Sequence, residues 1–230
     1  MRFSVVFPGL FAGRLDFDKA VLENLYGREK RECMGKIIGL TGGVGCGKST
    51  VIELLRENFR CLAVLTDEVA REQMLPGGVS YARVVEEFGD SILARDGTVD
   101  RGALAALVFP DPVKLERLNA LTHPAVTEYV TGLAEKERRE NRYEFLLIET
   151  ALLIEGGYDQ FCDEVWYIYA PAGQRRERLK KSRGYPDKKI DDLIARQKSE
   201  EEFLAVATHV IDNRDGTTKE ALLENIKEIL

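Results

Sequence analysis

The feature that most constrains this chain is a glycine-rich run at residues 42–50 that fits the pattern G-x-x-x-x-G-K-S. Glycines let the backbone curl so that successive N–H groups point inward at phosphate oxygens. In this pattern the lysine reaches the β- and γ-phosphates of a nucleotide, and the serine hydroxyl binds Mg²⁺. The run therefore predicts a nucleotide-phosphate site formed by Gly43, Val44, Gly45, Cys46, Gly47, Lys48, Ser49 and Thr50.

The segments on either side of the run have the order that this chemistry requires. Residues Lys36–Thr41 are apolar and β-branched, which is typical of a buried parallel strand. After the run, apolar residues recur at helical spacing from Val51 to Phe59. A helix there would aim its positive N-terminal end at the bound phosphate.

Apolar runs of the same kind recur along the chain, and segments that predict helices separate them. The sequence therefore predicts an α/β layered fold around a mainly parallel sheet. Its core is expected at residues 34–75 and 144–230, with an inserted helical lobe at about 76–143 and a basic lid at about 174–196. The further strands are expected at Cys61–Thr66, Phe145–Ile148, Val165–Tyr169 and Val210–Asn213.

The inserted lobe has no strand candidates. Helices are expected at Tyr81–Phe88 and Arg101–Phe109. A third helix should start at Asp111 and end at His123-Pro124. A fourth, long helix should begin there, because a proline can end one helix and start another.

Composition narrows the class of protein. Of the 230 residues, 44% are hydrophobic and 31% are charged, as in ordinary soluble globular proteins. The net charge of −6 argues against a dedicated duplex-binding protein, and no apolar run approaches the length of a membrane span. We therefore expect a cytoplasmic protein with small-molecule substrates, and neither a nucleic acid, a membrane nor an obligate protein as partner.

The four cysteines form no C-x-x-C pair, and with only two histidines a structural zinc site is not expected. We expect reduced thiols. Cys46 lies inside the glycine-rich run near a helix N-terminus, so its thiol is expected to be more acidic than usual and to be protected from alkylation by ATP.

Residues 1–33 precede the first predicted strand. Pro8 and Gly9 interrupt their apolar stretch, which argues against a signal peptide. Met34 stands immediately before the strand and is typical of a natural start. We interpret residues 1–33 as an extension that reflects either a start assigned too early or a real appendage.

Residues 174–183 are densely basic. Such a run is usually one solvated helix face. The phosphate site favours a second interpretation, a lid that folds over the triphosphate and supplies cations, because phosphoryl transfer needs positive charge. The basic residues are Arg175, Arg176, Arg178, Lys180, Lys181 and Arg183.

Gly42, Asp67 and Glu149 each fall just after a predicted strand. Ligands of parallel sheets gather at the carboxyl ends of strands, so these residues are expected to converge on one site. From the sequence alone Asp67 has two possible roles, as a catalytic carboxylate or as a helix N-cap.

Several separated motifs, taken in order, resemble the dephospho-CoA kinases, which catalyse the last step of coenzyme A synthesis. The resemblance extends from Lys36 to the C-terminus and begins with I-I-G-L-T-G-G-V-G-C-G-K-S-T-V. The other segments that carry it are Asp67–Arg71, Glu87–Gly89, Ile92-Leu93, Asp96-Gly97, Val99–Arg101, Leu104, Val108-Phe109, His123-Pro124, Leu152–Glu155, Gln197 and Val210–Asn213.

The resemblance implies a P-loop NTPase three-layer fold and phosphoryl transfer from Mg-ATP to the ribose 3′-hydroxyl of dephospho-CoA, giving CoA and ADP. Asp67 would orient and deprotonate that hydroxyl, Lys48 would stabilise the charge on the transferred group, and the helical lobe would bind the acceptor. The implied acceptor-binding residues are Arg101, His123 and Glu155, the lid residues are Arg178 and Arg183, and the Mg²⁺ ligands are Ser49 with Asp67 or Glu149.

The chain departs from the family pattern at four places, of which the first three bear on magnesium and the lid. Leu65 stands where the family has an acid, and Glu149 is a longer acid that lacks the usual proline two residues later. Ser182 takes the place of a lid arginine, with Arg183 one residue late. The motif Thr208-His209 replaces the usual A-D before the last strand.

Three alternatives belong to other functional classes. The first is a P-loop kinase of a nucleoside monophosphate or a similar small acceptor. The second is a non-catalytic nucleotide-binding module, which the lost acid at Leu65 favours. A regulatory GTPase is disfavoured, because the chain has no N-K-x-D segment after a strand.

Overall fold

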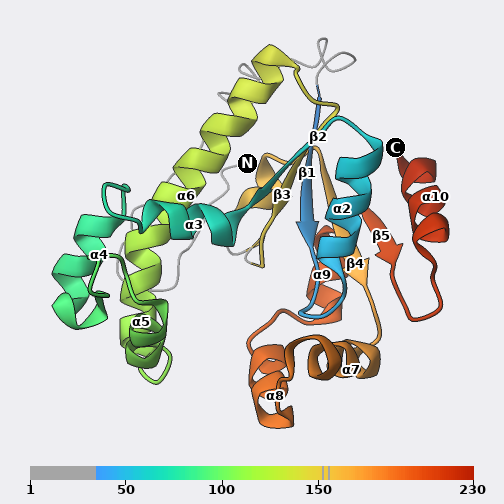
Figure 1. Ribbon diagram of the computed structural model, residues 1–230. Helices are drawn as coiled ribbons and strands as arrows, with labels where there is room; N and C mark the ends of the chain where they lie inside the picture. The colour runs from blue at the N-terminus through green and yellow to red at the C-terminus, as the bar shows by residue number, and fades with distance from the viewer. Residues whose placement is uncertain (1–34, 152, 155) are drawn as a thin grey trace. The chain divides into compact units, whose positions relative to one another are not determined.

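The computed structural model of the chain describes residues 35–151, 153, 154 and 156–230. The predicted extension at residues 1–33 lies outside the described residues, as do Leu152 and Glu155. The described part forms two compact units (Figure 1). We call residues 35–64 with 137–230 the sheet unit, and residues 65–136 the helical unit.

The sheet unit is built on a five-stranded sheet with the strand order β2-β3-β1-β4-β5. The central strand β1 pairs in parallel with β3 on one side and with β4 on the other, and β5 pairs in parallel with β4. The predicted α/β fold with a mainly parallel sheet is thereby confirmed, and each predicted strand is correct to within about one residue at either end. The strands are β1 (Lys36–Thr41), β2 (Cys61–Leu65), β3 (Phe145–Glu149), β4 (Glu164–Tyr169) and β5 (His209–Asp212).

The main core of this unit lies between the sheet and two helices, α2 (Lys48–Asn58) and α10 (Lys219–Ile229). Trp166 and Ile168 of β4 are fully buried there, together with Leu55 of α2. Burial of side chains of this size stabilises a fold by about 1.5–3 kcal/mol each. This packing fixes the start of α2 directly beyond the end of β1, which is where the glycine-rich run lies.

Three further helices lie between β4 and β5 in the chain. They are α7 (Ala172–Arg183), α8 (Asp187–Ala195) and α9 (Glu200–Val206), with a short 3₁₀ helix, η3 (Tyr158–Gln160), ahead of β4. Phe203 of α9 stacks on Tyr167 of β4 with ring centroids 5.2 Å apart. The basic segment predicted as a lid therefore forms α7, α8 and the turn between them.

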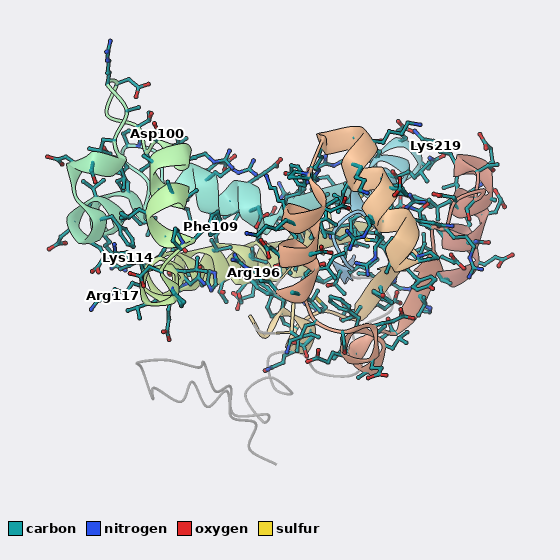
Figure 2. The ribbon with its side chains drawn as sticks, turned by 90° about the horizontal axis from the view of Figure 1, so that it is seen from below. Asp100, Phe109, Lys114, Arg117, Arg196 and Lys219 are labelled. Atoms are coloured by element: carbon teal, nitrogen blue, oxygen red, sulfur yellow. The ribbon has the colours of Figure 1, made fainter. Side chains whose placement is uncertain are left out.

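The helical unit contains no strand longer than an isolated bridge between Leu93 and Val99 in its described residues. Its core gathers Val84, Ile92 and Leu104. Asp100 accepts hydrogen bonds from two N–H groups at the start of α5, which fixes where that helix begins (Figure 2). The elements are α3 (Thr66–Gln73), α4 (Tyr81–Phe88), η2 (Asp90–Ile92), α5 (Arg101–Val108) and the first part of α6 (Pro112–Glu140).

The predicted helix boundary at His123-Pro124 is wrong, because α6 runs without interruption through Pro124. Thr122, Val126 and Val130 are buried at intervals of four residues, so one face of the helix stays packed on both sides of the proline. That burial outweighs the hydrogen bond that the proline cannot donate. Although α6 is long, none of the described helices has the length and apolar character needed to cross a membrane.

Replacing Pro124 with Ala should stabilise the protein by roughly 1–3 kcal/mol, because the helix interior gains an N–H donor and loses a steric clash. Thermal unfolding measures the effect. Pro112→Ala is the matched control, since Pro112 is the first residue of α6, a position where proline fits, and it should gain nothing. A lower unfolding temperature for Pro124→Ala would contradict the prediction.

Candidate active site

The loop between β1 and α2, which we call the phosphate loop (residues 42–47), has a backbone that only glycine adopts readily. Gly42, Gly45 and Gly47 have φ angles of 147°, 82° and 95°. A Cβ atom on Gly47 would lie 2.1 Å from Nδ2 of Asn213, and one on Gly42 would lie 2.6 Å from the carbonyl oxygen of Ile168. Both the torsion angles and the available space therefore require glycine.

The ammonium group of Lys48, at the start of α2, turns back onto this loop. Its Nζ donates a hydrogen bond to the carbonyl oxygen of Gly42 at 2.8 Å and lies 3.6 Å from Oε1 of Glu149. Glu149 is the last residue of β3 and stands beside Leu40 of β1 in the sheet. The predicted convergence of Gly42 and Glu149 at the strand ends is therefore found in the sheet unit, and it places a cation at the loop.

Side chains from the C-terminal part of the chain hold the backbone of the phosphate loop. Nδ2 of Asn213 donates to the carbonyl oxygen of Cys46 at 2.8 Å, and Nη1 of Arg178 donates to the same oxygen at 3.3 Å. Oε1 of Gln197 accepts a hydrogen bond from the N–H of Val44 at 2.8 Å. Gln197 and Asn213 belong to segments that carried the family resemblance, but their contact with the loop was not predicted.

The two predicted lid arginines have different surroundings. Arg178 also donates to Oδ1 of Asp215 at 2.7 Å, so its guanidinium links α7 to the loop that follows β5. Arg183, at the end of α7, stacks on the ring of Tyr185 with 5.9 Å between the guanidinium carbon and the ring centroid. Of these two arginines, Arg178 is therefore the one that hydrogen-bonds to the phosphate loop, and the lid role of both stays a prediction.

The expectation of an acidic thiol at Cys46 is wrong. The side chain is 1% exposed, and this burial raises its pKa. The charge of Lys48 acts in the opposite direction but is the smaller influence. The glycine-rich run correctly placed Cys46 near a helix N-terminus, but the sequence could not show that the thiol faces the core instead of the anion site.

Asp67 and His123 both belong to the helical unit. Asp67 lies in the first turn of α3, and the N-cap position is Leu65, so the alternative that Asp67 caps this helix is wrong. His123 lies on α6, where burial lowers the pKa of its imidazole; the negative charge of Asp67 acts in the opposite direction to a smaller extent. His123 is therefore neutral at pH 7, within electrostatic reach of a carboxylate.

A small pocket in the helical unit has a mostly apolar lining to which two arginine side chains contribute. It is lined by Arg71, Met74, Leu75, Val99 and Arg101. Arg71 was not predicted as a site residue, although it stands four positions after Asp67 on α3 and therefore shares its helix face. Such a pocket suits a ligand with both anionic and apolar groups.

The predicted site residues thus fall into two sets. The phosphate-binding residues from Gly43 to Thr50, together with Glu149, Arg178 and Arg183, belong to the sheet unit. Asp67, Arg101 and His123 belong to the helical unit, and Glu155 lies outside the described residues.

A known protein family matches the part of the chain that contains these predicted site residues. The family model for dephospho-CoA kinase matches residues 36–220. The chain belongs to the dephospho-CoA kinase family. The dephospho-CoA kinase of Moorella thermoacetica is 44% identical over 143 residues, which are 62% of this chain and 67% of that protein.

Two further comparisons cover more of the chain. The dephospho-CoA kinase of Geobacter sulfurreducens is 37% identical over 193 residues, which are 84% of this chain and 96% of that protein. The crystal structure of TT1252 from Thermus thermophilus superposes with a TM-score of 0.68 at 29% identity and covers 85% of this chain and 96% of its own. These findings confirm the resemblance predicted from the sequence, and with it the class of enzyme, a kinase with a phosphate loop.

The lowered pKa of His123 predicts a specific dependence of stability on pH. As the pH falls below 6.5, the unfolded chain takes up a proton on this residue before the native protein does, so the free energy of unfolding decreases. His123→Gln should remove that part of the loss. The measurement is thermal unfolding of both proteins at about pH 8 and about pH 5. An identical fall in unfolding temperature for both proteins would contradict the prediction.

Proposed function

We propose that this protein transfers the γ-phosphoryl group of ATP to the ribose 3′-hydroxyl of dephospho-CoA, giving CoA and ADP. The observation that carries the proposal is the phosphate loop with Lys48 bound to the Gly42 carbonyl, 3.6 Å from Glu149, in a chain that matches the dephospho-CoA kinase family over residues 36–220. Leu65 departs from the family pattern, but it lies outside residues 42–49, which keep the complete G-x-x-x-x-G-K-S pattern.

The phosphate loop supplies binding and electrostatic stabilisation. Its backbone N–H groups and the N-terminus of α2 would bind the phosphate oxygens of ATP. Lys48 would stabilise the negative charge that develops on the transferred group. Phosphoryl transfer needs little covalent participation by the protein, so correct positioning accounts for most of the catalysis.

Magnesium is expected with ATP. In the described part of the chain no three or more His, Cys, Asp and Glu side chains gather where they could hold a metal ion alone. The residues fit an ion that nucleotide phosphates also ligate, because Glu149 places a carboxylate beside Lys48 at the loop. Ser49 with Glu149 or Asp67 would hold it, and the ion would neutralise charge on the β- and γ-phosphates.

Asp67 is proposed as the base that orients and deprotonates the acceptor hydroxyl. Its carboxylate makes no hydrogen bond and no ion pair within the described residues, so it is available to a ligand. The neutral His123 lies within its electrostatic reach and could donate a hydrogen bond to an acceptor oxygen without adding charge.

The acceptor is proposed to bind the pocket of the helical unit. Dephospho-CoA carries phosphate groups and a pantetheine arm with both apolar and polar parts. The pocket offers the arginines Arg71 and Arg101 for the phosphates and the apolar side chains of Met74, Leu75 and Val99 for the arm. Arg101 is the residue that both the resemblance and the pocket favour. A role for Glu155, a lid function of Arg178 and Arg183, and a cytoplasmic location remain predictions.

Release of ADP from Mg-ATP tests the proposal, measured with dephospho-CoA, with AMP, with CMP and without an acceptor. Turnover with dephospho-CoA alone, with CoA as product, is the expected result. Turnover with a monophosphate would assign the protein to the nucleoside monophosphate kinases. ATP binding without any transfer would identify a non-catalytic nucleotide-binding module.

Asp67→Asn should retain ATP binding and lose turnover by about 100-fold or more, because a general base contributes about 10²–10⁴ in rate. Steady-state kinetics and nucleotide titration measure the two properties separately. Glu68→Gln is the matched control, since it removes the neighbouring exposed carboxylate of α3 and should leave turnover unchanged. Near-normal turnover of Asp67→Asn would exclude the role as base.

A further inference from the structure

One arginine beside the phosphate loop has no ion-pair partner among the residues that the structure describes. Arg175 lies in the first turn of α7, where its N–H bonds to the carbonyl oxygen of Pro171 at 3.0 Å. Its Nε is buried without a hydrogen-bond partner, and its guanidinium forms no ion pair with any described carboxylate. A buried N–H donor left without a partner costs free energy, so this half-buried side chain is suited to an anion that arrives from outside.

The guanidinium lies directly on the phosphate loop. A Cβ atom on Gly43 would be 1.8 Å from Nη1 of Arg175 and 2.8 Å from its Cζ. Gly43 is not among the positive-φ glycines of the loop, so its backbone does not require glycine. A larger residue at position 43 would therefore have to displace the end of the Arg175 side chain.

Three neighbouring cations of α7 differ, because each of them has an acidic partner, and the remaining two, Lys181 and Arg183, are exposed. Arg176 bonds to Asp187 at 3.1 Å and also to Asp191, and Lys180 bonds to Asp187 at 2.8 Å. Arg178 is held by Asp215 and by carbonyl oxygens. Among the cations of α7, Arg175 is thus distinguished by a buried Nε that has no hydrogen-bond partner in the described residues and by its place on the phosphate loop.

We propose that Arg175 is a phosphate ligand of the bound nucleotide, with its guanidinium donating hydrogen bonds to oxygens of the β- or γ-phosphate. The inference rests on the proposed function in one respect, namely that the bound nucleotide is ATP. A guanidinium suits this task because its planar fork donates two parallel N–H bonds to one phosphate group. Lys48, a point charge already bonded to the Gly42 carbonyl, cannot supply that geometry.

Arg175→Met tests the inference, because methionine fills similar space without charge or donors. Calorimetric titration with ATP, ADP and AMP should give affinity for ATP roughly tenfold to hundredfold lower than that of the unaltered protein, with AMP affinity unchanged. Loss with ATP alone indicates the γ-phosphate, and equal loss with ADP indicates the β-phosphate. Arg176→Met, which removes the neighbouring paired arginine, is the matched control and should bind like the unaltered protein.

Thermal unfolding without nucleotide separates this role from a purely structural one. Removing a half-buried arginine whose Nε has no hydrogen-bond partner should not lower the unfolding temperature, and the rise in that temperature on adding ATP should shrink. A variant that is less stable but binds ATP normally would overturn the inference, as would equal weakening of ATP and AMP. Either result leaves the proposed function intact, because that depends on turnover of dephospho-CoA by the unaltered protein.

A double-mutant cycle that combines Gly43→Ala with Arg175→Met tests the contact between these two residues independently. The added methyl group would displace the guanidinium, so Gly43→Ala should weaken ATP binding about tenfold when Arg175 is present. In the Arg175→Met background the same change should have little further effect, because the guanidinium is already absent. Additive losses would show that Gly43 acts independently of Arg175 and would contradict the proposed pairing.

Discussion

The curled backbone of the phosphate loop is the constraint on which the rest of the site depends. A glycine-rich segment loses much conformational entropy when it is ordered. Here that loss is offset by contacts from distant parts of the chain: Asn213 and Arg178 donate to the carbonyl oxygen of Cys46, and Gln197 accepts from the N–H of Val44. The loop shape in turn fixes the ammonium group of Lys48 beside Glu149. Phosphate binding by this protein is therefore a property of the whole sheet unit.

The predicted site residues are divided between the two units. The sheet unit holds the groups that we propose for the nucleotide, which are the phosphate loop, Lys48 and Glu149. The helical unit holds Asp67 and an arginine-lined pocket. The chain passes from the first unit to the second where β2 ends and α3 begins. Asp67, which is proposed as the base, follows that strand by two residues.

Two failed predictions have the same physical origin. Pro124 indicated a helix boundary, but α6 continues because its buried face extends on both sides of the proline. The thiol of Cys46 was expected to be acidic beside Lys48 and a helix N-terminus, but desolvation in the core raises its pKa. Local sequence rules describe what a residue prefers in isolation. Burial, which depends on residues far away in the chain, outweighed that preference in both cases.

The sequence alone determined the strands, the glycine-rich loop and the family, and it predicted Lys48, Asp67 and Arg101 as site residues. It could do so because hydrophobic periodicity and glycine torsions act over a few neighbouring residues. Only the tertiary structure decided that Arg71 shares a pocket with Arg101, that Asn213 and Gln197 brace the loop, and that Arg175 lies unpaired on Gly43. These contacts join residues separated by up to 167 positions, and such distances are set by the packing of helices on the sheet and not by any local pattern.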